Sequence, residues 1–120
     1  MTTILLVEDN EKNMKLLRDV LTAKGYRVLE ATSGEEAVEL TLADEPQLVL
    51  MDVQLPGIDG VEALHRVRAD PRTTGVPVLA LTAQAMDGDR ERFLAAGFDG
   101  YLSKPVDIVE LLATVAAYVH

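Results

Sequence analysis

The chain alternates short apolar runs with longer amphipathic stretches, five times over. The apolar runs predict strands at residues 3–7, 27–31, 47–52, 77–82 and 98–102, and the amphipathic stretches predict helices at 11–24, 34–44, 60–69, 86–96 and 107–118. Two of the runs, 47–52 and 77–82, lack polar alternation, which is typical of parallel strands that are covered on both faces. The pattern therefore predicts an α/β fold, a doubly wound parallel sheet with helices on both faces.

Capping residues support these boundaries. Ser33, Asp59 and Asp107 each stand three residues before a glutamate, which is the spacing of a capping box at a helix start. Gly25 and Gly97 follow predicted helices, where a left-handed residue closes the last turn. We expect the helices to begin and end close to these positions.

Polar residues stand where the apolar runs end. Glu8 and Asp9 follow the first run, Asp52 ends the third, Thr82 ends the fourth, and Lys104 follows the fifth. Because open α/β sheets place their sites at the carboxyl edge, we expect these side chains to gather there. Three carboxylates, a hydroxyl and an ammonium at one point indicate divalent-metal and phosphoryl chemistry.

Each of these residues also has an ordinary explanation when it is taken alone. A strand-end acid or Thr82 can cap the next helix, and Lys104 can be a surface lysine. Together they favour a site, because crowded carboxylates raise one another's pKa unless a cation neutralises them. Oxygen ligands favour Mg²⁺ or Mn²⁺, and the metal, Lys104 and Thr82 would each take one phosphoryl oxygen. The Lys104-Pro105 bond predicts a sharp turn that aims the lysine at the cluster.

Composition excludes several classes of function. The 120 residues, 48% of them apolar, suffice for one domain with its own core. A formal charge of −9 repels phosphate backbones and argues against nucleic-acid binding. The absence of cysteine excludes disulfides and thiol catalysis and fits a reducing compartment. With no membrane-spanning run and no room for a signal peptide, we expect a cytoplasmic protein that does not contact membranes.

Four segments resemble the receiver domain of two-component response regulators. They are Val-Glu-Asp-Asn at 7–10, Leu-Met-Asp-Val-Gln-Leu-Pro-Gly-Ile-Asp-Gly at 50–60, Ala-Leu-Thr-Ala at 80–83 and Tyr-Leu-Ser-Lys-Pro at 101–105. The resemblance spans residues 1–120 and implies a (βα)5 flavodoxin/CheY-like fold with strand order 2-1-3-4-5 and no output domain. The first motif is most like that of single-domain DivK-type regulators, and receivers of hybrid histidine kinases share it.

The resemblance implies a role for each residue of the cluster. Asp52 would accept a phosphoryl group from a phosphohistidine. Asp9, Asp52 and the backbone oxygen of Gln54 would hold Mg²⁺, with Mn²⁺ as a possible substitute. Glu8, where the family more often has aspartate, would reach the metal through a water molecule. Lys104 would bind one phosphoryl oxygen.

The resemblance also implies a switch. Thr82 would donate its hydroxyl to another phosphoryl oxygen, and Tyr101 would turn inward once Thr82 moves. The chain would then signal by phosphorylation-dependent protein–protein interaction, catalysing only its own phosphorylation and dephosphorylation. This makes it a signalling protein and not a turnover enzyme.

The first predicted helix carries more apolar residues than one buried stripe needs. Leu17, Val20 and Leu21 are expected to face the core. The expected partners are a histidine kinase or histidine phosphotransfer protein, then a downstream protein target, with the chain itself monomeric. Residues expected to contact a partner are Asn10, Asn13, Leu16, Tyr101 and Pro105.

Three other functions remain open at this stage. A metal phosphohydrolase with an aspartyl-phosphate intermediate usually has a second acid two residues after the nucleophile, where this chain has Gln54. A pseudo-receiver would bind partners without phosphorylation, but the intact set of Asp9, Asp52, Thr82 and Lys104 argues against it. A flavin carrier would need a phosphate-binding loop after the first strand, and none is evident.

Overall fold

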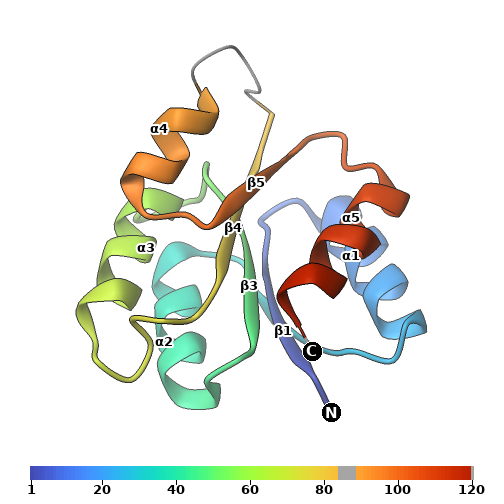
Figure 1. Cartoon of the computed structure of the whole chain (residues 1–120), viewed down its shortest axis with the longest axis horizontal. Helices are drawn as coiled ribbons and strands as arrows, with labels where there is room; N and C mark the ends of the chain where they lie inside the picture. The colour runs from blue at the N-terminus through green and yellow to red at the C-terminus, as the bar shows by residue number, and fades with distance from the viewer. Residues whose placement is uncertain (84–88, 120) are drawn as a thin grey trace.

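The computed structural model describes residues 1–83 and 89–119, which form one parallel sheet and five helices (Figure 1). The strands are β1 (Thr3–Val7), β2 (Arg27–Ala31), β3 (Leu48–Asp52), β4 (Val78–Thr82) and β5 (Gly100–Ser103). The helices are α1 (Glu11–Ala23), α2 (Gly34–Asp44), α3 (Gly60–Ala69), α4 (Asp89–Ala96) and α5 (Ile108–Tyr118). The strand order β2-β1-β3-β4-β5 confirms the predicted topology. Among the described residues, no helix is both long enough and apolar enough to cross a bilayer.

The helices cover both faces of the sheet. Helices α1 and α5 lie on one face, and α2, α3 and α4 lie on the other (Figure 1). Because side chains alternate along a strand, β1 serves both layers. Ile4 and Leu6 pack with the residues of α1 and α5. Leu5 and Val7 pack with those of α2, α3 and α4 and with Phe98, which lies between α4 and β5. This two-sided burial explains why the central strands lack polar alternation.

The predicted boundaries are correct to within one or two residues for most elements. β4 begins at Val78 and not at residue 77, because Pro77 has no N–H to donate to the sheet. The pattern predicts the fifth strand at 98–102, but β5 runs from Gly100 to Ser103; Asp99 lies just before it, where its carboxylate accepts a hydrogen bond from the Val78 N–H. The predicted start of the fourth helix at 86 lies outside the described residues.

The predicted caps are confirmed. Ser33, Asp59 and Asp107 accept backbone hydrogen bonds at the starts of α2, α3 and α5, as N-cap residues do. Gly25 and Gly97 have φ values of 92° and 115°, in the left-handed region. These local signals fix where each helix stops and hence where each following strand enters the sheet.

Gly60, the first residue of α3, packs directly against the end of β3. A Cβ at this position would lie 2.5 Å from the Asp52 carbonyl oxygen and 2.9 Å from the Val53 Cα. We therefore expect Gly60→Ala to lower the free energy of unfolding by about 2 kcal/mol, through overpacking, as measured by urea denaturation. Gly75→Ala is the control: a Cβ there meets nothing within 4 Å, and we expect a change within about 0.5 kcal/mol. Equal losses in the two variants would contradict this packing.

Candidate phosphorylation and metal site

The strand register brings the predicted polar residues to one edge of the sheet. Val7 lies opposite Met51, which places the next residues, Glu8 and Asp52, side by side. Thr82 lies opposite Ser103, the residue before Lys104, and the Lys104 N–H donates to the Thr82 carbonyl at 2.7 Å. A cavity of about 310 Å³ opens at this edge. It is lined by Glu8, Asp9, Asn10, Asn13, Asp52, Val53, Gln54, Thr82, Ala83 and Lys104.

Lys104 joins the two central carboxylates. Its Nζ donates to Glu8 Oε1 and Oε2 at 3.0 and 2.7 Å and to Asp52 Oδ2 at 2.8 Å. The other oxygen of Asp52, Oδ1, accepts the Gln54 N–H at 3.0 Å. The Lys104-Pro105 bond is cis, and the lysine side chain points into the cluster and not to solvent.

Glu8 is the most deeply buried acid of the cluster, with 1% of its surface exposed. Burial raises its pKa above the ordinary value, and Asp52 raises it further, while hydrogen bonds from Lys104 and Asn13 lower it. The Asn13 bond runs from its amide nitrogen to Glu8 Oε1 at 3.2 Å. Partial burial lowers the pKa of Lys104, but the hydrogen bonds to Asp52 and Glu8 outweigh it, so that pKa lies above its usual value. The Lys104 ammonium therefore contacts both acids and lowers the pKa of Glu8 against the effect of burial.

The acidic cluster fits a divalent cation. Glu8, Asp9 and Asp52 each offer a carboxylate oxygen, and these oxygens all lie within 4.8 Å of one another. Three carboxylates against one ammonium leave an excess of negative charge in a half-enclosed cavity. An all-oxygen donor set of this kind suits Mg²⁺ or Mn²⁺ better than zinc.

Thr82 and Tyr101 lie on neighbouring strands, but in different surroundings. Thr82 is buried, with 4% of its surface exposed, and lines the acidic cavity. Tyr101 is half-buried and packs against α4, with its ring centroid 6.3 Å from that of Phe93. Tyr101 pairs with Ala80, two residues before Thr82 along β4.

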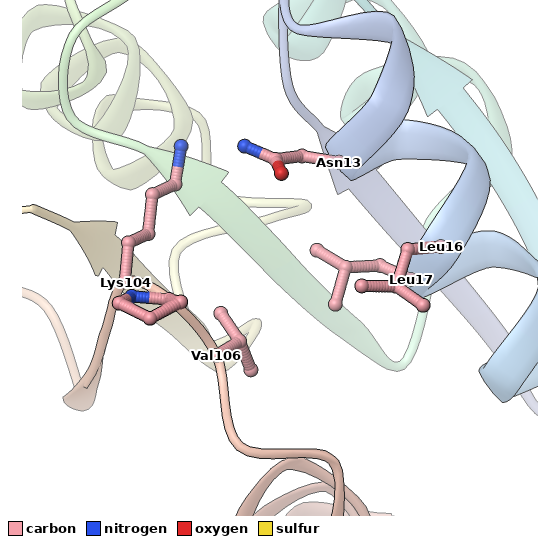
Figure 2. Close-up of a pocket in the computed structure, with 6 residues that line it drawn as sticks. Asn13, Leu16, Leu17, Lys104 and Val106 are labelled. Atoms are coloured by element: carbon pink, nitrogen blue, oxygen red, sulfur yellow. The ribbon is translucent and has the colours of Figure 1, made fainter.

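The residues expected to contact a partner separate into different environments. Asn10 is exposed, but its side-chain oxygen caps α1 by accepting from the Lys12 and Asn13 N–H groups. Leu16 is 50% exposed, and Pro105 is also exposed. Between α1 and residues 104–106 lies a small apolar groove of about 80 Å³ (Figure 2). Its lining consists of Asn13, Leu16, Leu17, Lys104, Pro105 and Val106.

The core-facing prediction for α1 is confirmed for Leu17 and Leu21, which are buried. Val20 is partly buried against the same core, and Met14, for which no side was predicted, is buried as well. Sequence reasoning also missed the inward turn of Asn13. Its amide nitrogen and the Lys104 ammonium point toward each other in Figure 2, and both donate hydrogen bonds to Glu8. No helical spacing could reveal this contact, because Glu8 lies before α1, which begins at Glu11.

Comparison with known proteins agrees with this geometry. Residues 4–116 match the response regulator receiver domain family. The polar-differentiation response regulator DivK of Brucella ovis is 41% identical over 116 residues, covering 97% of this chain and 94% of DivK.

Two solved structures are similar throughout. The receiver domain of a sensor histidine kinase from Pseudomonas aeruginosa, which has a magnesium ion coordinated in its active-site cleft, is 39% identical with a TM-score of 0.90, covering 98% of this chain and 96% of that one. The receiver domain of Ssk1 from Saccharomyces cerevisiae, solved with the histidine phosphotransfer protein Ypd1, is 30% identical with a TM-score of 0.90. The match covers 98% of this chain and 88% of that one. On its fold, its edge cluster and these matches, the chain belongs to the response regulator receiver domain family.

Proposed function

We propose that this chain is a phosphoacceptor that takes a phosphoryl group on Asp52 from a phosphohistidine, in a Mg²⁺-dependent reaction, and signals through other proteins. The observation that carries the proposal is the contact of Lys104 with both Asp52 and Glu8 inside an acidic cavity. A lysine held this way is already placed to neutralise charge on a group attached to Asp52.

The chemistry follows from the positions of the side chains. A carboxylate oxygen of Asp52 attacks the phosphorus, the P–N bond to the donor histidine breaks, and the imidazole leaves with the electron pair. Lys104 shifts from its shared contact to a phosphoryl oxygen, and the Thr82 hydroxyl donates to another. Mg²⁺ bound by Asp9, Asp52 and the Gln54 carbonyl oxygen, with Glu8 in contact through water, would neutralise phosphoryl charge during the transfer.

Phosphorylation of the purified chain by acetyl phosphate tests this proposal directly. We expect one phosphoryl group per chain in the presence of Mg²⁺, detected by intact-mass spectrometry, and at least a tenfold lower rate in EDTA. Restoring the rate with Mn²⁺ would fit the all-oxygen site. Equal rates with and without a divalent ion would overturn the metal part of the proposal.

The phosphoryl group would change a second surface through Thr82 and Tyr101. Phosphorylation adds about −1.5 to −2 charges and strong acceptor oxygens, so Thr82 is drawn toward Asp52 and leaves space that the Tyr101 ring can enter. The surface of α4, β5 and α5 beside Tyr101 holds an open cavity of about 370 Å³. A downstream protein would read this surface in its altered form.

The partner that delivers the phosphoryl group would dock on the groove of Figure 2, which adjoins the acidic cavity through Asn13 and Lys104. The Ssk1 receiver, solved with Ypd1, shows that a relative binds a histidine phosphotransfer protein. Here the exposed Leu16 and Pro105 would contact the donor's helices, and a histidine kinase is the alternative donor.

Leu16→Asp tests this docking surface. We expect transfer from a histidine kinase or phosphotransfer protein that phosphorylates the wild type to slow at least tenfold, because a buried charge would face the donor's apolar helix. The rate with acetyl phosphate should change less than twofold. Leu94→Asp is the matched control, since Leu94 is 41% exposed but lies on α4, across the sheet from α1 (Figure 1). Equal slowing in both variants would place the donor elsewhere.

A further inference from the structure

The first turn of α2 holds the loop that follows Asp52. This loop, residues 53–59, connects β3 to α3 and carries Gln54 near its start. Glu35, the second residue of α2, reaches across to it, and its Oε1 accepts a hydrogen bond from the Ile58 N–H at 3.0 Å. The same bond lowers the pKa of Glu35, so the side chain is a charged acceptor at neutral pH.

Two glycines allow α2 and the loop to touch. Gly57 has a φ of +74°, and a Cβ there would lie 2.5 Å from both carboxylate oxygens of Glu35. A Cβ on Gly34 would clash with the Ile58 carbonyl oxygen. The carboxylate is therefore seated directly against one glycine and bonded to the next residue. The Glu35 carboxylate therefore packs closely against the loop, although the Glu35 side chain is exposed to solvent.

The base of the loop is fixed from the opposite side. The Val53 N–H donates to the Leu81 carbonyl at 3.1 Å, and the Gly60 N–H donates to the Val53 carbonyl at 2.9 Å. The Gln54 N–H donates to Asp52 Oδ1 at 3.0 Å. Gln54 thus lies between two fixed parts of the loop: Val53, which is hydrogen-bonded to the sheet, and Ile58, which is hydrogen-bonded to Glu35.

We propose that Glu35 is a positioning residue for the metal site, holding the 53–59 loop so that the Gln54 backbone keeps its place beside Asp52. The inference rests on the proposed function for the role of the Gln54 carbonyl. Its geometric part, that Glu35 fixes the loop, stands without it. Residues that orient a metal ligand without touching the metal are conserved nearly as well as the ligands themselves.

Three variants on one helix test the proposal: Glu35→Ala, Glu35→Gln and, as a charge-matched control, Glu39→Ala, since Glu39 is an exposed acid on α2. The Mg²⁺ dissociation constant is measured by calorimetry, with thermal melting alongside. We expect Glu35→Ala to weaken Mg²⁺ binding about five- to tenfold. Glu35→Gln, which keeps an acceptor oxygen, and Glu39→Ala should stay within twofold of the wild type.

Amide hydrogen exchange by NMR, in metal-free protein, separates this inference from the proposed function. Glu35→Ala should speed exchange at both Ile58 and Gln54, while Glu39→Ala should leave both unchanged. If the wild type binds no Mg²⁺, the proposed function fails and the exchange data alone decide the role of Glu35. Unchanged Gln54 exchange, or a fall in melting temperature with Mg²⁺ affinity intact, would overturn the inference. An equal loss of affinity in Glu39→Ala would do so as well.

Discussion

Replacing Asp52 with alanine is expected to abolish stable phosphorylation of the chain. Asp52 lies at the end of β3 with one oxygen on the Gln54 N–H and the other on Lys104, so its carboxylate faces the cavity in a fixed orientation. Neighbouring Glu8 is not expected to substitute, because it is 1% exposed against 6% for Asp52, and because Lys104 binds both oxygens of Glu8 but only one of Asp52. Intact-mass spectrometry after incubation with acetyl phosphate and Mg²⁺ should show no added phosphoryl group.

Asp59→Ala is the matched control for this experiment. Asp59 is an exposed aspartate seven residues further along, and it caps α3 by accepting from the Glu62 N–H at 2.9 Å. Its loss should cost about 1 kcal/mol of stability and leave phosphorylation in place. Wild-type stoichiometry of phosphate in Asp52→Ala would show that the acceptor is another residue, even with Asp59→Ala behaving as expected.

Much of the fold could be predicted from local signals. Continuous apolar runs marked strands buried on both faces, and Ser33, Asp59 and Asp107 marked helix starts that the structure confirms. The boundary that was wrong by two residues, at β5, depends on long-range contacts. The Asp99 carboxylate accepts from Val78 and from Arg68, which lies 31 residues earlier, so no local pattern reveals that turn.

The site shows the same division. The convergence of Glu8, Asp52 and Lys104 could be predicted, since parallel strands share a carboxyl edge and each residue ends an apolar run. How they pair could not be predicted, because it depends on side-chain length: Glu8 reaches Lys104 with both oxygens, at 3.0 and 2.7 Å. The contact of Glu35 with Ile58 could not be predicted either. Glu35 lies within a capping-box sequence, which indicates only the start of its own helix, and Ile58 is 23 residues away.

Lys104 is expected to stabilise the fold as well as to bind a phosphoryl oxygen, because it pairs with two buried carboxylates. Lys104→Ala would leave the side chains of Glu8 and Asp52, 1% and 9% exposed, beside each other without their cation. We expect the free energy of unfolding in EDTA to fall by about 2 kcal/mol, below the 3–5 kcal/mol of a fully buried pair, because water reaches part of Lys104. Urea denaturation measures the loss. Lys15→Ala is the control, since its pair with Asp19 is exposed and should contribute less than about 0.5 kcal/mol.

Added Mg²⁺ should reduce the difference in the free energy of unfolding between Lys104→Ala and the wild type. In the wild type the ammonium already occupies Asp52 Oδ2 and both oxygens of Glu8, so a cation must share these atoms with it. In the variant the cation meets the carboxylates without that competitor, and it should bind more tightly. Because saturating Mg²⁺ stabilises both proteins, the deficit shrinks by the ratio of their dissociation constants, about 1.4 kcal/mol for each tenfold tighter binding by the variant. A deficit that is the same in EDTA and in saturating Mg²⁺ would mean that Lys104 and the metal do not act on the same carboxylates.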